Sequence, residues 1–290
     1  MAHARRNVPS HLVEASRSAP DGAAWISALP NLVDDLMERW RLTPGEGRLG
    51  AGSCSWVAPV VRADGTPAVL KLALPHMEAE HEIAGLRFWD GDGMARLLEA
   101  DEAASALLLE RCLPGRPLRT LPAAAQDDVI AATLRRLWRR PPPGAFRPLA
   151  VMIEHWSAGV RAERDRWPDP ALVEEGLAIF ADLARPGGDD VLLATDLHAG
   201  NVLAAAREPW LAIDPKPFVG DRAYDATQHL LNGPERLRLQ GERTVERLAG
   251  LLAVDAERVR LWTYARLAAG PCPRWDEAHA LARIVGLPGG

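Results

Sequence analysis

Three side chains that can offer oxygen ligands lie within a short stretch of the chain: Asp196, Asn201 and Asp214. Asp196 and Asn201 begin and end the hexapeptide D-L-H-A-G-N, and Asp214 ends the apolar run W-L-A-I-D. Residues 191–214 read as extended chain with a turn at 207–209, so a hairpin would return Asp214 to Asn201. A carboxylate near an attacking hydroxyl, together with two oxygen ligands for Mg²⁺, is what phosphoryl transfer requires from a protein.

The D-x-x-x-x-N spacing of Asp196 and Asn201, followed later by an aspartate, is typical of protein-kinase-type enzymes. The spacing alone is common by chance, and the structural alternative is that both side chains cap turns. A strand before the loop, a hairpin after it and an aspartate at the end of the hairpin favour the functional interpretation. We therefore predict that Asp196, Asn201 and Asp214 form a phosphoryl-transfer centre, with Asn201 and Asp214 facing one metal ion.

Lysine is rare in this chain, because only two of the 34 basic residues are lysines and the others are arginines. Lys71 lies in the apolar segment P-A-V-L-K-L, where a buried ammonium is costly unless a counter-charge meets it. The helix expected over 78–89 offers Glu78, Glu80 and Glu82, and we favour Glu82. The alternative is a lysine at a sheet edge that extends its ammonium into water.

Two further segments fit a nucleotide-binding lobe. The apolar run at 106–115 leads into a Pro-Gly hinge, where kinase-like folds bind adenine through backbone groups. By position these groups are the carbonyl of Glu110 and the amide of Cys112. A glycine-rich stretch that includes Gly52 and Ser53 could cover phosphates with its amides, although any hairpin favours such residues. A Walker-type P-loop is absent from the sequence, since no Gly-Lys pair occurs in it.

The surrounding elements predict an α+β fold of the protein-kinase-like, bilobal type. Short apolar runs and glycine turns within 46–74 and 94–113 predict a five-stranded antiparallel sheet with one helix packed on it. We expect an N-terminal nucleotide-binding lobe with a helical extension over 1–112, and a mainly helical catalytic and substrate-binding lobe over 113–290. Residues 1–25 read as irregular. The other expected helices span 31–42, 122–139, 148–165, 170–185, 223–232, 234–252, 255–269 and 275–285.

Composition restricts the partners of the chain. A net charge of -5 and a pI near 5.9 argue against a nucleic-acid binder, which favours a clustered basic face. The sequence contains no apolar run of membrane-spanning length and no signal-peptide core at its start. Cys54, Cys112 and Cys272 are scattered without metal-ligand spacing, as in a reducing compartment. We expect a cytoplasmic protein, a monomer or weak homodimer, that binds neither nucleic acid nor membrane.

Four stretches match the pattern of a known family, and the last is the most specific. They are ADGTPAVLKLALP at 63–75, HEIAGLRFWDGDGMARLLEAD at 81–101, ALLLERCLPG at 106–115, and DLHAGNVLAAAREPWLAIDPKPFVGDRAYDATQHL at 196–230. Through them the chain resembles the aminoglycoside phosphotransferases, most closely the branch of the streptomycin 6-kinases and hydroxyurea phosphotransferases. The resemblance covers most of the chain and is thin across 120–185.

The resemblance implies an ATP- and Mg²⁺-dependent kinase that phosphorylates a hydroxyl. It implies that Asp196 is the catalytic base and that Asn201 and Asp214 bind the metal. It also implies that Lys71 contacts phosphate.

Three features near this loop carry further expectations. In the segment G-D-R-A-Y-D we expect Asp221 to brace the catalytic loop and Asp225 to flank the substrate. Lys216 is expected near phosphate or substrate, with a solvent-facing position as the alternative. The sequence departs from the family at Ala194-Thr195, where His-Gly usually precedes the catalytic aspartate. Threonine has less backbone freedom than glycine, and the missing histidine removes a group that normally braces the loop.

The leading hypothesis is a kinase that inactivates a cationic aminocyclitol antibiotic such as streptomycin. Acidic side chains would attract such an acceptor, and the candidates are Asp225, Glu235, Asp276 and Glu277. One alternative is a kinase of another small alcohol, sugar or hydroxyurea-like metabolite, since the fold alone does not select an acceptor. The other is a nucleotide-binding pseudokinase, which the Ala194-Thr195 departure motivates.

Overall fold

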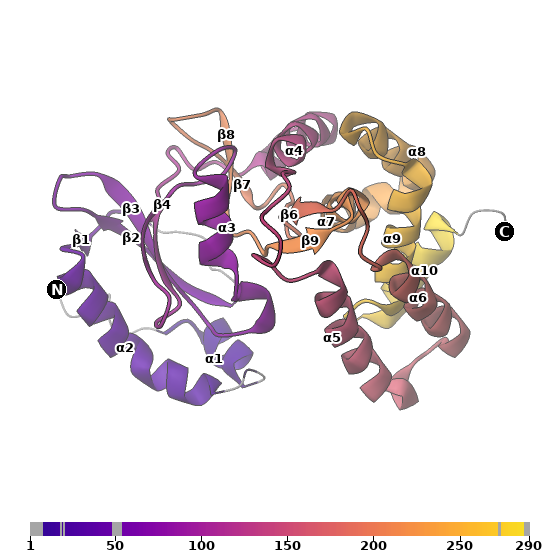
Figure 1. Cartoon of the computed structure of the whole chain (residues 1–290), viewed down its shortest axis with the longest axis horizontal. Coiled ribbons are helices and arrows are strands. Elements are labelled where there is room, and N and C mark those ends of the chain that lie inside the picture. Colours follow the sequence, from indigo (N-terminus) through magenta and orange to yellow (C-terminus); the bar gives the residue numbers. More distant parts are fainter. Residues whose placement is uncertain (1–7, 18, 20, 48–53, 272–273, 287–290) are drawn as a thin grey trace. The chain divides into compact units, whose positions relative to one another are not determined.

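The structure is a computed structural model that describes residues 8–17, 19, 21–47, 54–271 and 274–286. The chain divides into two compact units (Figure 1). The first comprises Met1–Gly115 with Ala205–Pro209, and the second comprises Arg116–Ala204 with Trp210–Gly290. The predicted boundary lay at 112/113, and the assignment of the turn 205–209 to the first unit was not anticipated.

The first unit is built on an antiparallel sheet in the order β1-β2-β3-β5-β4. The predicted five-stranded sheet is therefore confirmed. Central strand β3 pairs with β2 on one side and β5 on the other, so Lys71 lies opposite Val57 and Leu107 rather than at a sheet edge. The strands are Thr43–Pro44 (β1), Ser55–Val61 (β2), Pro67–Ala73 (β3), Leu97–Asp101 (β4) and Ala106–Glu110 (β5).

The two faces of this sheet are covered by different helices. Helices α1 (Ser10–Ser16) and α2 (Gly22–Arg39) pack on the face that carries Leu70 and Leu72, which are fully buried. Because side chains alternate along a strand, Lys71 points to the opposite face. That face carries the short turn Met77–Ala79 (η1) and helix α3 (Glu82–Trp89), which lies across the sheet from α2 (Figure 1).

The N-terminal helices correct the sequence-based expectation. Residues 1–25 were expected to be irregular, yet α1 lies within them and α2 begins at Gly22 rather than at residue 31. Pro30 lies inside α2, and its helix-breaking character obscured the start of the helix. Trp25 and Leu29 are buried one turn apart before this proline, so packing on the sheet holds the helix together across it.

The second unit is mainly helical, as predicted. Trp262 on α9 is fully buried and contacts Tyr224 on α7 and Phe180 on α6, so α9 forms the centre of the packing. The helices are Ala123–Leu137 (α4), Leu149–Ala162 (α5), Pro170–Leu183 (α6), Arg222–Leu231 (α7), Pro234–Leu252 (α8), Ala256–Ala269 (α9) and Trp275–Val285 (α10), with turns at Leu118–Thr120 (η2) and Arg164–Arg166 (η3).

Two small antiparallel pairs occupy the stretch that was read as extended. Val191–Leu193 (β6) pairs with Phe218–Gly220 (β9), and Val202–Ala204 (β7) pairs with Trp210–Ala212 (β8). The β7–β8 hairpin confirms the predicted hairpin. Strand β9 lies beyond residue 214 and was not anticipated, and it closes a loop that begins at the end of β6.

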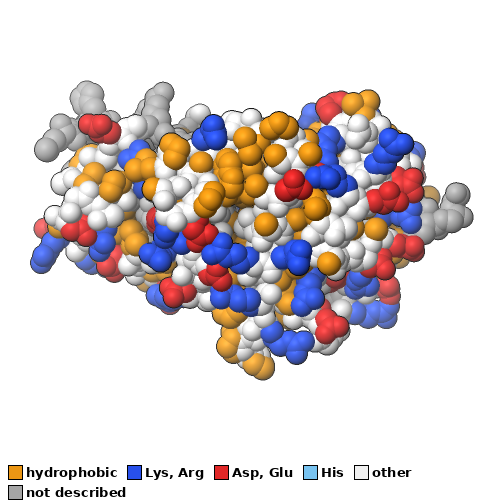
Figure 2. Space-filling model, turned by 90° about the horizontal axis from the view of Figure 1, so that it is seen from above, with side chains coloured by type: hydrophobic (Ala, Val, Ile, Leu, Met, Phe, Trp, Pro, Cys, Tyr) orange, Lys and Arg blue, Asp and Glu red, His pale blue; other side chains and the backbone are white. Residues whose placement is uncertain are grey.

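Basic and acidic side chains are interspersed over the face drawn in Figure 2. Within the described ranges, none of the helices has the length and apolar character that crossing a bilayer demands.

Close packing of α6 on α9 makes a testable prediction. A Cβ at Gly176 would lie 2.8 Å from the Cβ of Ala268 and 2.9 Å from that of Ala269. We expect Gly176→Ala to lower the free energy of unfolding by about 1–3 kcal/mol, although alanine favours helix more than glycine does. Urea unfolding measures this change.

The matched control is Gly250→Ala on α8, where an added Cβ would meet no heavy atom within 4 Å. Here we expect a gain of about 0.5–1 kcal/mol, because only the helix propensity changes. Equal effects of the two substitutions would contradict the close approach of α6 and α9.

Candidate active site

The buried ion pair of the first unit joins Lys71 on β3 to Glu82 on α3. The Lys71 Nζ lies 2.6 Å and 2.7 Å from the two carboxylate oxygens of Glu82. The two residues are 5% and 3% exposed, so neither charge is solvated. The structure thus pairs Lys71 with the glutamate that sequence analysis favoured. Glu82 shares the buried face of α3 with Gly85, Leu86 and Trp89.

The predicted adenine-binding segment lies at the end of β5, where an arginine holds it. Arg207, in the turn assigned to the first unit, donates from Nε and Nη2 to the Glu110 carboxylate at 2.8–3.1 Å. It also donates to the carbonyls of Gly91 and Met94. Burial alone would raise the pKa of Glu110, but the bonds from Arg207 hold it below its ordinary value. Sequence analysis read Arg207 only as a turn residue.

Other predicted nucleotide contacts stay predictions. Burial raises the pKa of the Cys112 thiol to about 12, so this side chain is a neutral, packed group. The adenine contacts were assigned to the backbone carbonyl of Glu110 and the backbone amide of Cys112. Gly52 and Ser53 lie outside the residues that the structure describes.

The loop between β6 and β7 brings Asn201 next to the segment that carries Asp214. The Asn201 amide nitrogen Nδ2 donates to the Asp196 carbonyl at 3.0 Å, and the Asn201 carbonyl accepts from Ile213 N at 2.9 Å. Because Nδ2 is engaged, the oxygen Oδ1 is the atom of Asn201 available to a metal ion. An amide oxygen and a carboxylate suit Mg²⁺, which usually takes one or two protein ligands and completes its shell with phosphate and water.

The carboxylate of Asp196 is held from two sides within the second unit. Lys216 Nζ lies 2.9 Å from Oδ2, and Gln228 Nε2 lies 2.5 Å from Oδ1. Arg266 donates to Gln228 Oε1 at 2.5 Å, which fixes the amide so that its nitrogen faces Asp196. These long-range partners left no local signal, and sequence analysis missed Gln228 and Arg266.

His198 is a neutral group inside the same loop. Its ring nitrogen Nδ1 accepts from Gly200 N at 3.1 Å. Burial lowers the pKa of His198, although the charge of Asp196 opposes the shift. A neutral imidazole is what the acceptor role of Nδ1 requires.

Asp225 braces the start of the loop between β6 and β7, which corrects its predicted role. Its carboxylate accepts from Thr195 N at 2.8 Å, from Ala194 N at 3.1 Å and from Trp138 Nε1 at 2.9 Å. Asp225 is 1% exposed, so its side chain faces the loop backbone rather than a substrate. Burial raises the pKa of Asp225 to about 6, against the opposing effect of these donors.

Asp221, which was expected to brace the loop, instead caps α7. Its side chain accepts from Ala223 N, from Trp262 Nε1 and from Arg258 Nε. An aspartate directly before a helical period is a typical N-cap, and that signal would have separated the two aspartates in the sequence. Asp225 lies one turn later and faces inward.

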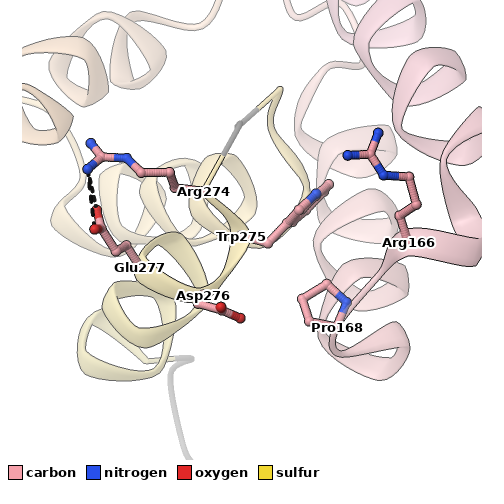
Figure 3. A pocket seen from close by; sticks show the side chains of 6 residues that line it. All are labelled: Arg166, Pro168, Arg274, Trp275, Asp276 and Glu277. Atoms are coloured by element: carbon pink, nitrogen blue, oxygen red, sulfur yellow. Dashed lines mark hydrogen bonds and ion pairs between the residues drawn. The ribbon is translucent and has the colours of Figure 1, made fainter.

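Two adjoining cavities lie on one side of the second unit and share Arg166 and Trp275. One, of about 600 Å³, is lined by His155, Trp156, Gly159, Val160, Glu163, Arg166, Pro271 and Trp275. The other, of about 530 Å³, is lined by Arg166, Pro168, Arg274, Trp275, Asp276 and Glu277. In Figure 3 Trp275 points toward Arg166 and Pro168, whereas Glu277 turns to Arg274.

The four acidic residues that were candidates for binding the acceptor lie in different places. Asp276 and Glu277 line a cavity, Glu235 pairs with Arg238 on the surface, and Asp225 is buried. The larger cavity is connected to Asp196 through side chains: the Arg266 guanidinium lies 5.6 Å from the ring centre of Trp156 and bonds Gln228, which bonds Asp196.

The Lys71–Glu82 pair makes a prediction about stability. Glu82→Ala would leave a buried ammonium without its counter-charge, so we expect a loss of about 3–5 kcal/mol in the free energy of unfolding. The double variant Lys71→Met/Glu82→Leu removes both charges, and it should recover most of this loss. A double variant as unstable as the single one in urea unfolding would show that packing rather than charge dominates here.

Asp225 makes a prediction about pH. Its pKa in the folded protein, about 6, exceeds the ordinary value of 3.8, so the folded state binds this proton more tightly than the unfolded chain. Its contribution to stability is fully present below about pH 4 and is lost as the pH rises through about 6. We expect the unfolding free energy of the wild type, relative to Asp225→Asn, to fall by roughly 2 kcal/mol between about pH 4 and pH 8. A difference that does not change with pH would contradict this.

Comparisons with known proteins show the family and the fold of the chain. Residues 39–277 match the family model described as aminoglycoside/hydroxyurea antibiotic resistance kinase. Streptomycin 6-kinase of Streptomyces griseus is 42% identical over 295 residues, covering 96% of this chain and 94% of that protein. Hydroxyurea phosphotransferase of Kitasatospora aureofaciens is 41% identical, covering 90% of this chain and 78% of that protein.

The choline kinase LicA of Streptococcus pneumoniae matches with a TM-score of 0.60 at 12% identity, covering 88% of this chain and 89% of that one. This match confirms the kinase-like fold. The chain is thus a small-molecule kinase that belongs to the aminoglycoside/hydroxyurea antibiotic resistance kinase family.

Proposed function

We propose that the chain transfers the γ-phosphate of ATP, with Mg²⁺, to a hydroxyl of a streptomycin-like aminocyclitol and thereby inactivates the antibiotic. The observation that carries the proposal is the setting of Asp196, whose carboxylate is oriented by Lys216 and Gln228 beside the Asn201 loop. The names of the relatives with 42% identity supply the acceptor class. The cytoplasmic location stays a prediction.

Asp196 acts in this proposal as the general base. Its carboxylate takes the proton of the acceptor hydroxyl as the oxygen attacks the γ-phosphorus, and the hydrogen bonds from Gln228 and Lys216 hold it in one orientation. Each carboxylate oxygen has two lone-pair sites, so these bonds leave positions for the incoming hydroxyl.

Asn201 Oδ1 and Asp214 are the groups that would hold a magnesium ion in this proposal. Mg²⁺ there would offset the negative charge of the phosphate oxygens. In the first unit, Lys71 would contact nucleotide phosphate, with Glu82 holding its ammonium in place.

The lining of the two adjoining cavities suits a cationic acceptor. Trp275 offers an aromatic face and, in the adjoining cavity, Asp276 offers a carboxylate, whereas Glu163 already pairs with Arg166. Cationic groups bind both kinds of surface, aromatic rings through cation–π contacts and carboxylates through charge-assisted hydrogen bonds. The side-chain connection from Trp156 through Arg266 and Gln228 to Asp196 makes this cavity the one we assign to the acceptor.

The 41% identical hydroxyurea phosphotransferase supports a second candidate acceptor. Hydroxyurea is small and uncharged, so it would use little of the aromatic and acidic lining. The pseudokinase alternative loses its motivation, because Thr195 is accommodated in the loop and both Asp196 and Lys71 have their partners.

Coupled ADP release with ATP, Mg²⁺ and an acceptor panel tests the proposal. We expect streptomycin-dependent turnover that falls by about 100-fold or more in Asp196→Ala, because the general base is lost. Glu235→Gln, which changes an exposed acidic residue paired with Arg238, should leave the rate unchanged.

Each other outcome has a distinct meaning. Faster turnover of hydroxyurea or an uncharged sugar would make the acceptor assignment wrong. Stabilisation by ATP and Mg²⁺ without turnover of any acceptor would favour a pseudokinase.

A further inference from the structure

Both lysines of the chain pair with a carboxylate, but in different settings. Lys71 and Glu82 are buried, whereas the side chains of Lys216 and Asp196 are 23% and 16% exposed. Every other basic residue besides histidine is an arginine. A lysine offers a compact charge on a flexible stem, whereas an arginine offers a rigid planar fork. Lys216 therefore places a mobile, partly exposed ammonium next to Asp196.

The backbone of Lys216 is tied to the two residues that precede Asp196. Lys216 N donates to the Ala194 carbonyl at 2.9 Å, and the Thr195 hydroxyl donates to the Lys216 carbonyl at 2.5 Å. Thr195 has a φ of 50°, a region that favours glycine, and a glycine there could not make the second bond. Ala194 and Thr195 are in turn held by Asp225. The position of Lys216 is thus fixed by the same loop that carries Asp196.

We propose that Lys216 is a further catalytic residue, whose ammonium contacts the phosphoryl group as it passes to the acceptor, with Thr195 as its positioning residue. This rests on the proposed function, in which Asp196 is the base. The attacked hydroxyl lies within hydrogen-bond reach of Asp196, and the Lys216 ammonium lies 2.9 Å from the same carboxylate. The phosphoryl oxygens that approach that hydroxyl therefore enter the reach of the flexible lysine stem.

The step balances without a change in Lys216. A bond forms between the acceptor oxygen and the γ-phosphorus, and the bond from that phosphorus to the bridging oxygen breaks, leaving its electron pair on ADP. The hydroxyl proton passes to Asp196. Lys216 keeps its protons and offsets the negative charge of the transferring group, which the nearby carboxylate would otherwise repel.

A merely structural ion pair predicts a different outcome. Gln228 also donates to Asp196, so the carboxylate keeps a hydrogen-bond donor and its orientation when Lys216 is removed. Loss of Lys216 should therefore affect the reaction far more than the fold.

The test compares Lys216→Ala, Lys216→Met and Lys216→Arg with wild type on streptomycin and ATP. We expect kcat of Lys216→Ala to fall about 100-fold or more, with KM for streptomycin within about threefold and Tm within about 2 °C. Added methylammonium should restore part of kcat in Lys216→Ala, which a structural role would not produce. Arg238→Ala, which removes an exposed paired charge, is the matched control and should leave kcat unchanged.

A second readout does not depend on turnover. ADP with aluminium fluoride mimics the transferring phosphoryl group, and its binding by calorimetry should weaken at least about tenfold in Lys216→Ala. Binding of ADP alone should stay within about twofold. If Lys216→Ala does not fold, Lys216→Met, which keeps most of the stem, takes its place.

Three results separate failure of this inference from failure of the proposed function. An unchanged kcat, or a kcat that falls only together with Tm and is not restored by methylammonium, would overturn the role of Lys216. Absence of streptomycin turnover in the wild type would overturn the proposed function. The aluminium fluoride measurement would then still decide whether Lys216 contacts the phosphoryl position.

Discussion

The loop between β6 and β7 depends on one buried carboxylate. Asp225 is almost fully buried and accepts the backbone amides of Ala194 and Thr195 together with the indole of Trp138. Two successive amides that point to one side chain fix the direction in which the chain leaves β6. The position of Asp196, one residue later, follows from that direction. A buried carboxylate is costly, and the three donors are what make this position tolerable.

Hydrogen bonds between backbone groups close the loop that Asp225 braces, and they hold both of its ends. The Ala194 carbonyl accepts from both Asp196 N and Lys216 N, so the start of the loop and the segment after Asp214 meet at one atom. The β7–β8 hairpin brings Ile213 to Asn201 from the other direction. The loop is therefore fixed at both ends by backbone geometry, and its side chains need to supply only charge and proton transfer.

Sequence reasoning worked where a local rule forces a partner. A lysine in the middle of an apolar strand must meet a counter-charge, and the next helix supplied Glu82. Strand–turn–strand spacing similarly predicted the hairpin that returns to Asn201. Sequence reasoning failed where hydrogen bonds join segments that are far apart in the chain. No local sequence pattern indicates the bonds of Arg207 to Glu110, of Gln228 to Asp196 and of Arg266 to Gln228. The bracing role, which was predicted for Asp221 and belongs to Asp225, is an intermediate case. The sequence contained an N-cap signal at Asp221 that was not used.

The Ala194-Thr195 departure from the family pattern shows why a missing motif residue need not mean a missing function. The loop retains a brace, because Asp225 binds backbone amides, which every residue type at 194 and 195 except proline provides. Thr195 occupies a conformation with φ near 50° that glycine adopts more readily, and this disfavours threonine unless its side chain contributes a bond. Its hydroxyl contributes one to the Lys216 carbonyl. The residue that looked least suited to the loop therefore connects the segment of Asp196 to that of Lys216, and Lys216 would be less well fixed if glycine stood at position 195.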